Sequence, residues 1–176
     1  MMRAISILLA SAVFCVSHAG ELANNAPTAT APTNRCVDFE LKDQFDQSHS
    51  LKFPSAKPIV LTVADKKGSD GVAAWAHPLG VRFDERIKIC GLADVSAVPK
   101  MLRGYVQGKF KKAFTHPAML DWDGKICAGF GYEKNQPNIY LIASDGRILL
   151  HRSGPVSEAG LKEFGDAIEA ELDSKR

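Results

Sequence analysis

The sequence contains no C-x-x-C pair, no H-x-x-x-H motif and no cluster of cysteine and histidine. The local patterns of dithiol exchange and of zinc binding are therefore missing. Four cysteines and five histidines are present, but they lie scattered along the 176 residues. We therefore expect no metal site and no cofactor, since a ligand or metal carrier would have only these scattered histidines in its favour.

A strong charge of either sign is also missing, because the formal net charge of the full chain is only +2. Without residues 1–19, which contain Arg3, 21 Lys and Arg oppose 20 Asp and Glu. A nearly neutral protein has no general attraction to nucleic acid or anionic lipid, so we expect neither as a partner. We interpret one local cluster as the solvated basic face of a helix: Lys100, Arg103, Lys109, Lys111 and Lys112.

No hydrophobic run is long enough to span a bilayer, which takes roughly 20 residues. The longest, from Ala4 to Val16, follows a short positive segment and precedes Ser17-His-Ala19, a small-x-small cleavage site. This pattern predicts a secretory signal peptide over residues 1–19, and hence a periplasmic or secreted protein without membrane attachment. Residues 20–35, rich in Ala, Pro, Thr and Asn, predict a flexible lead, and residues 36–176 predict a single domain.

The remaining chain predicts an α/β fold built around the apolar run Pro58-Ile-Val-Leu-Thr-Val-Ala, which is typical of a strand buried on both faces. A polar loop and a helical pattern follow this run, and we expect Pro78 to kink or end that helix. The other elements that we expect are a hairpin over 37–53, strands at 86–94, 118–121, 138–142 and 147–152, and helices at 98–114, 126–132 and 157–172.

This order resembles the thioredoxin fold, in the version with an extra N-terminal β-hairpin that redoxins have. The similarity rests on three segments: Phe39-Glu-Leu-Lys-Asp, Asp121-Trp-Asp-Gly-Lys-Ile-Cys and Gln136-Pro-Asn-Ile-Tyr-Leu-Ile. The resemblance implies a central mixed sheet with helices on both faces. It also implies that the Gln136–Pro137 bond is cis and faces the active-site loop.

Thioredoxin-type sites read Trp-Cys-Gly-Pro-Cys and carry a proline five residues beyond the second cysteine. Aligning Pro78 with that proline places Asp70 and Ala73 at the two cysteine positions. We expect Asp70 to gain from the helix dipole and capping bonds, but neither side chain can exchange a disulfide. The chain is most similar to the exported YtfJ-type group, which likewise lacks the cysteine pair.

Export would leave three cysteines in an oxidising compartment: Cys36, Cys90 and Cys127. Three thiols allow one bridge in three pairings, and the sequence does not choose among them. Cys36, beside the flexible lead, is expected to be exposed or bridged. Cys90 is expected to be an inert apolar side chain within a strand, whereas Cys127 lies near Lys125 and is a candidate reactive thiol.

Two functions fit these features. The first is a non-catalytic or redox-associated binding module that docks an extended peptide segment or a partner protein. Its groove is predicted between Asp65, Gly68 and Ser69 on one side and Gln136 and Pro137 on the other. The alternative is an atypical thiol-disulfide oxidoreductase or peroxide-reducing enzyme that uses Cys127 or Cys36. None of these features indicates an oligomeric state.

Overall fold

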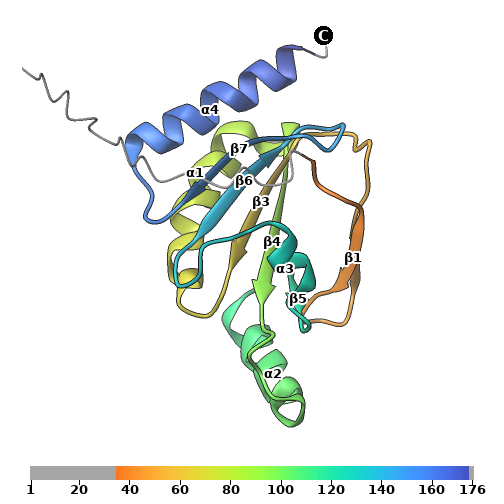
Figure 1. Cartoon of the computed structure of the whole chain (residues 1–176). Helices are drawn as coiled ribbons and strands as arrows, with labels where there is room; N and C mark the ends of the chain where they lie inside the picture. The colour runs from red at the N-terminus through yellow and green to blue at the C-terminus, as the bar shows by residue number, and fades with distance from the viewer. Residues whose placement is uncertain (1–34, 175–176) are drawn as a thin grey trace, which may run out of the picture. The chain divides into compact units, whose positions relative to one another are not determined.

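The computed structural model describes residues 35–174, so the predicted signal peptide and nearly all of the predicted lead lie outside the described residues. Within the described part, no helix is both long and apolar enough to cross a membrane. Figure 1 shows its strands and helices, which are β1 (Phe39–Lys42), β2 (Ser48–Leu51), β3 (Ile59–Ala64), α1 (Val72–Phe83), β4 (Lys88–Asp94), α2 (Arg103–Ala113), β5 (Ala118–Asp121), α3 (Lys125–Gly129), β6 (Asn138–Ile142), β7 (Ile148–Ser153) and α4 (Glu158–Asp173).

A five-stranded mixed sheet in the order β5-β4-β3-β6-β7 forms the centre of the fold. β3 pairs in parallel with β4 and antiparallel with β6, so its two edges are both occupied. All six of its residues are buried, as its apolar sequence predicted. The α/β class and the separate hairpin of β1 and β2 are confirmed as well.

Helices α1 and α4 cover one face of the sheet (Figure 1). α1 contributes Trp75, Leu79 and Phe83, which lie one turn apart and are all buried against Phe164 and Ile168 of α4. This row continues past Pro78, and the helix ends only at Phe83. The prediction that the helix stops at Pro78 is therefore wrong, because apolar packing on both sides of the proline holds the last turn in place.

The opposite face is covered by the hairpin and by the short helix α3. Phe39 and Leu51 from the hairpin pack together with Cys127 of α3 and with Phe130, which directly follows it. The rings of Phe39 and Phe130 meet edge-on with their centroids 6.2 Å apart. Helices therefore lie on both faces, as the resemblance implied, although the hairpin provides much of this second layer.

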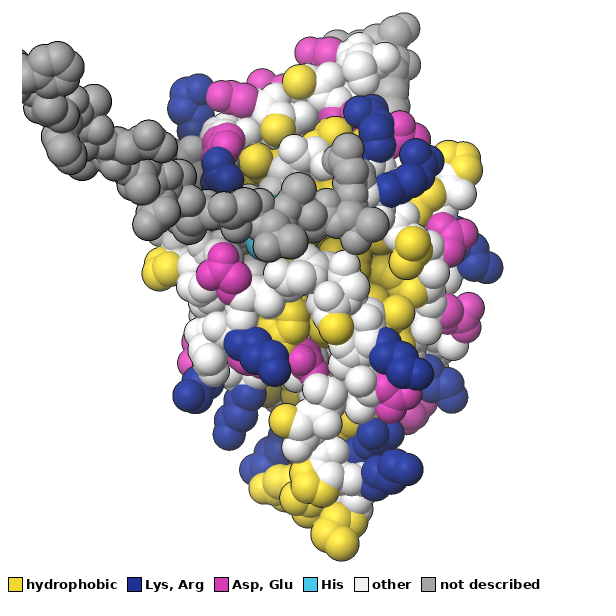
Figure 2. All heavy atoms as spheres, in the orientation of Figure 1, with side chains coloured by type: hydrophobic (Ala, Val, Ile, Leu, Met, Phe, Trp, Pro, Cys, Tyr) yellow, Lys and Arg dark blue, Asp and Glu magenta, His cyan; other side chains and the backbone are white. Residues whose placement is uncertain are grey.

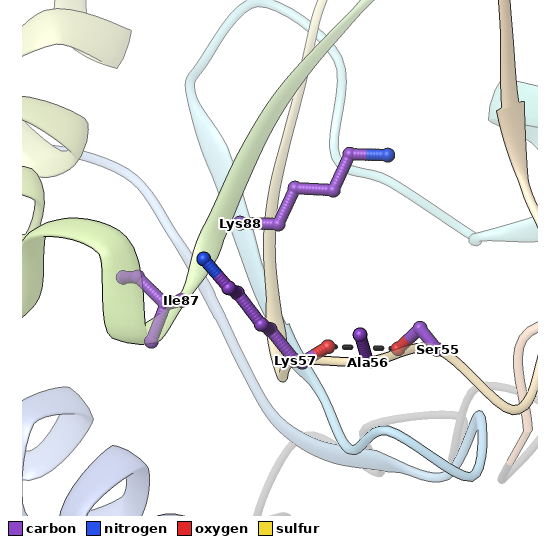
Figure 3. A pocket seen from close by; sticks show the side chains of 5 residues that line it. All are labelled: Ser55, Ala56, Lys57, Ile87 and Lys88. Atoms are coloured by element: carbon purple, nitrogen blue, oxygen red, sulfur yellow. Dashed lines mark hydrogen bonds between the residues drawn. The ribbon is translucent and has the colours of Figure 1, made fainter.

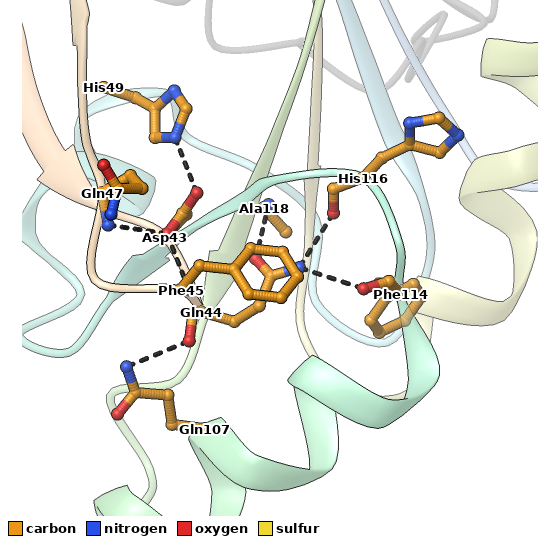
Figure 4. Close-up of polar contacts among 9 residues, drawn as sticks. All are labelled: Asp43, Gln44, Phe45, Gln47, His49, Gln107, Phe114, His116 and Ala118. Carbon is orange, nitrogen blue, oxygen red and sulfur yellow. Dashed lines mark hydrogen bonds and ion pairs between the residues drawn. The ribbon is translucent and has the colours of Figure 1, made fainter.

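Helix α2 differs from the other long helices, because none of its residues is buried. Its apolar spacing correctly predicted a helix, but polar contacts attach it to the hairpin (Figure 4). The Gln107 amide donates to the Gln44 carbonyl oxygen at 3.1 Å and to Asp46 Oδ1 at 2.8 Å. The fully buried Gln44 side chain in turn donates to the carbonyl oxygens of Phe114 and His116 and accepts from the backbone N–H of Ala118.

Candidate functional site

The loop after β3 is shaped by Asp65, the first residue beyond the strand. Its Oδ1 atom accepts hydrogen bonds from the backbone N–H of Lys67 at 3.0 Å and of Gly68 at 2.9 Å. Its carbonyl oxygen accepts from the backbone N–H of Ser69 at 3.0 Å. These bonds turn the chain into a 3-10 turn over Gly68–Gly71, which leads directly into α1.

The segment before β6 faces this loop and is held by the fully buried Asn138. The Asn138 Nδ2 donates to the carbonyl oxygens of Glu133 at 2.8 Å and Gln136 at 2.9 Å, while its Oδ1 accepts from the Glu133 backbone N–H. The His151 Nε2 atom is hydrogen-bonded to the Asn138 Oδ1 atom at 3.3 Å. The His151 ring also stacks on the Tyr140 ring, with the ring centroids 4.1 Å apart. Burial lowers the pKa of His151, which favours the neutral form of the imidazole.

The two segments touch each other directly. Asp65 Oδ2 accepts from the backbone N–H of Asn135 at 2.8 Å. A Cβ added at Gly68 would lie only 2.3 Å from the Gln136 carbonyl oxygen, and one at Gly71 would lie 2.8 Å from Pro137 Cγ. The predicted groove residues on both sides are therefore brought together, and glycine is needed where the two backbones meet.

The predicted cis bond at Gln136–Pro137 is wrong. Among the described residues, the cis peptide bonds comprise Phe53–Pro54 alone. Trans is the ordinary state of a bond to proline. The Gln136 carbonyl oxygen also fits against Gly68 and accepts the Asn138 amide, so the packing of the two segments does not require the cis isomer.

Asp70 and Ala73, the positions aligned with the missing cysteines, lie at the beginning of α1 and are both exposed. Asp70 belongs to the 3-10 turn, and the N-cap position of α1 is Gly71, where no side chain makes a capping bond. The expected capping role of Asp70 is therefore wrong, because the 3-10 turn leads directly into α1 and places Gly71 at the N-cap position.

All three cysteines of the described residues are free thiols, so the allowed single bridge does not form. Cys36, which was expected to be exposed or bridged, is only 6% exposed because it packs against the core under the hairpin. Burial and the neighbouring Asp38 raise the pKa of its thiol to about 12. Burial also raises the pKa of Cys90, against a smaller opposing effect of Lys88.

Cys127 has the least reactive surroundings of the three, because its thiol is fully buried among acidic groups. Burial raises its pKa, and the carboxylates of Asp121 and Asp94 raise it further. The nearby Lys125, which motivated the candidate, does not contribute to this shift. A thiolate is the reactive form of cysteine, so Cys127 is not an activated nucleophile at neutral pH.

A row of aspartates that was not predicted lies at the carboxyl ends of the three parallel strands. Asp65 follows β3, while Asp94 and Asp121 end β4 and β5. The Tyr132 hydroxyl donates to Asp94 at 2.5 Å, and burial together with this bond raises the pKa of Tyr132. Asp121 accepts from the backbone N–H groups of Gly124 and Cys127, as expected for a residue that forms a turn. An aspartate after each of three apolar strands is the signal that could have revealed this row.

Two hollows lie elsewhere on the surface. One, of about 400 Å³, lies at the amino ends of β3 and β4, and its two lysines, Lys57 and Lys88, point in different directions (Figure 3). Ligand sites of α/β sheets lie at the carboxyl ends of the strands, so this position does not favour a binding site. The other, of about 360 Å³, lies between β1, α2 and the end of β5. The described residues contain no group of three acidic, histidine or cysteine side chains that could hold a metal ion.

Comparison with known proteins identifies the fold. No protein-family model and no curated protein matches the sequence. The exposed lipoprotein thioredoxin Etrx1 from Streptococcus pneumoniae matches with a TM-score of 0.61 and 14% identity, over 74% of this chain and 99% of that one. StoA from Bacillus subtilis matches with a TM-score of 0.56 and 16% identity, over 75% and 98% of the two chains. The peroxidoxin BcpB from Mycobacterium tuberculosis matches with a TM-score of 0.51 and 21% identity, over 81% and 96%.

The fold is therefore thioredoxin-like, as predicted. Because all three identities are low, the similarity concerns the arrangement of strands and helices and not the chemistry of these proteins.

Proposed function

We propose that this chain is an exported thioredoxin-like protein that binds a partner and carries out no thiol chemistry. The observation that carries this proposal is the exposed beginning of α1, where Asp70 and Ala73 lie and no thiol is present. Thiol-disulfide exchange needs a thiolate of low pKa and a second thiol to resolve the mixed disulfide. This site offers a carboxylate and a methyl group instead.

The proposed binding surface is formed by the loop after β3 and the segment before β6. Asp65 and Ser69 contribute half-buried side chains on one side and Gln136 on the other, while Gly68 and Pro137 lie buried where the two segments meet. The direct contact between the two backbones and the hydrogen bonds of Asp65 and Asn138 give this surface a fixed geometry. A rigid surface loses little conformational entropy on binding, which suits the docking of an extended peptide segment.

The alternative of an atypical thiol enzyme has less support. Etrx1 is described as a thioredoxin and BcpB as a peroxidoxin. The thiols of Cys36 and Cys127, the candidates for such an activity, are buried and have raised pKa values, and the half-buried Cys90 has a raised pKa as well. Both effects lower the fraction of accessible thiolate at neutral pH.

Insulin reduction in the presence of dithiothreitol tests the proposal. The wild-type protein should not accelerate insulin precipitation above dithiothreitol alone, whereas Asp70→Cys/Ala73→Cys should, because residues three apart at the start of a helix meet the distance needed for a disulfide. Ala74→Cys/His77→Cys is the matched control, with the same spacing one turn further from the helix N-terminus, and should be much less active. Robust turnover by the wild-type protein would refute the absence of thiol chemistry.

Export is the second part of the proposal, and it rests on residues 1–19 and on the similarity to the YtfJ-type group. Cleavage after Ala19 would release a protein that begins at Gly20, with residues 20–35 before the domain. Mass spectrometry of the protein recovered from the periplasmic fraction of an expressing bacterium tests this. A product that keeps Met1 and stays in the cytoplasm would contradict it.

A further inference from the structure

Helix α2 and the 3-10 turn before it, Lys100–Leu102, expose apolar side chains that the fold does not use. Met101 is 89% exposed and Tyr105 is 65% exposed, and Leu102 and Phe114 are exposed as well. Figure 2 shows hydrophobic side chains gathered at the tip over α2, with Lys and Arg beside them. Contiguous exposed apolar side chains of this kind mark interaction sites.

The charge of this segment has one sign. Five cations and no carboxylate lie between Lys100 and His116. Arg103 and Lys111 make exposed ion pairs with Asp123 and Asp46, while no ion pair within residues 35–174 involves Lys100, Lys109 or Lys112. The segment therefore offers unneutralised positive charge next to apolar side chains.

Apolar and basic groups share one stripe, which consists of Met101, Tyr105, Lys109 and Lys112. Tyr105, Lys109 and Lys112 follow one another at intervals of four and three along the same side of α2, and Met101, four residues before Tyr105, lies in the 3-10 turn that leads into the helix. The Lys109 ammonium lies 5.4 Å from the centroid of the Tyr105 ring. The stripe therefore changes from apolar at its amino end to basic at its carboxyl end.

The helix also has little that stabilises it when uncovered. Gly104 and Gly108 lower its intrinsic stability, and a Cβ added at either would meet no atom within 4 Å. Most helices in proteins are stabilised by an apolar face packed against the core, and α2 has none. An occupant of the stripe would supply this missing packing.

We infer that the stripe docks an acidic segment of a partner protein, with apolar residues that contact Met101 and Tyr105 and carboxylates that contact Lys109 and Lys112. Charge complementarity favours an acidic occupant. Helices that lie on anionic membranes separate an apolar face from a basic face, whereas here both groups occupy the same stripe. Exposed methionine and tyrosine are typical of protein interfaces.

The probe is a fluorescein-labelled peptide with leucines in one half and glutamates in the other, and its binding is followed by fluorescence anisotropy. Wild-type protein should bind it, and binding should weaken with added salt because exposed ion pairs are screened. Met101→Ser/Tyr105→Ser and Lys109→Gln/Lys112→Gln should each raise the Kd about tenfold or more. Val81→Ser and Lys57→Gln/Lys88→Gln, which change exposed apolar and basic residues away from both proposed surfaces, should leave the Kd unchanged.

Two further measurements test other occupants of the stripe. Vesicles of equal parts phosphatidylglycerol and phosphatidylcholine, sedimented with the protein, should not retain it, and retention that the stripe variants abolish would identify a membrane surface instead. Sedimentation of the protein alone should show no dimer that these variants disrupt, since such a dimer would make a second copy the occupant. No peptide binding by folded wild-type protein, or equal loss in the control variants, would also overturn the inference. Circular dichroism verifies that every variant is folded.

Discussion

At the scale of single residues, Asp43 shows how a buried charge is kept in this fold. It is only 1% exposed and lies in the hairpin turn, where it accepts hydrogen bonds from the backbone N–H groups of Phe45 and Gln47 and from the His49 ring (Figure 4). Burial alone would raise the pKa of this carboxyl, but the three hydrogen bonds outweigh burial and lower the pKa. The ionised form of Asp43 therefore stabilises the folded protein.

Asp43→Asn should lower the free energy of unfolding by about 2 kcal/mol at pH 7, since hydrogen bonds to a charged acceptor are lost. The contribution of Asp43 is full above the unfolded pKa of about 3.9 and is lost as the pH falls through the lower folded pKa. The difference between the variant and wild type should therefore shrink below about pH 4. Urea unfolding of the variant and the wild type at pH 7 and below about pH 4 measures this difference in stability. Asp166→Asn, at an exposed pair with Lys162, is the control and should change stability by less than about 0.5 kcal/mol.

At the scale of elements, the geometry of the candidate site depends on the contact between the loop after β3 and the segment before β6. Gly68→Ala should lower the free energy of unfolding by about 1–3 kcal/mol, because the new Cβ would lie 2.3 Å from a backbone oxygen that cannot rotate away. Gly108→Ala, in the open helix α2, should instead raise it by about 0.5–1 kcal/mol. Thermal unfolding of both variants gives the comparison. Equal effects in the two would show that the loops do not pack as described.

The elements themselves could be predicted where local pattern and burial agree. The uninterrupted apolar run of β3 indicated a strand buried on both faces, and the helix expected at 157–172 is α4, where Ser157 accepts a capping bond from the Gly160 backbone N–H. Sequence patterns failed to predict features that depend on contacts in the folded structure. The spacing of apolar residues in α2 does not show that none of them is buried against the core. No local pattern predicts that the Asn138 side chain donates to the Gln136 carbonyl oxygen.

At the scale of the whole molecule, the fold separates its thiols from its candidate site. The positions next to the contact between the two loops hold no cysteine, and every thiol of the described residues lies in or beside the core on the hairpin side of the sheet. Export, as proposed above, would place these free thiols in an oxidising compartment, where exposed thiols risk wrong pairing. Burial under the hairpin and α3 protects them, which gives this layer a function besides packing.

The native protein should therefore react slowly with 5,5′-dithiobis(2-nitrobenzoate). The pKa of Cys36, raised from 9.0 to about 12, alone reduces its thiolate fraction about a thousandfold at pH 7, and burial of Cys127 blocks the approach of the reagent. In guanidinium chloride the mature chain should release the colour of its three thiols rapidly. A thiol that reacts as fast in the native state as in the denaturant would restore the thiol enzyme as a candidate, and alkylation followed by mass mapping would identify which cysteine carries it.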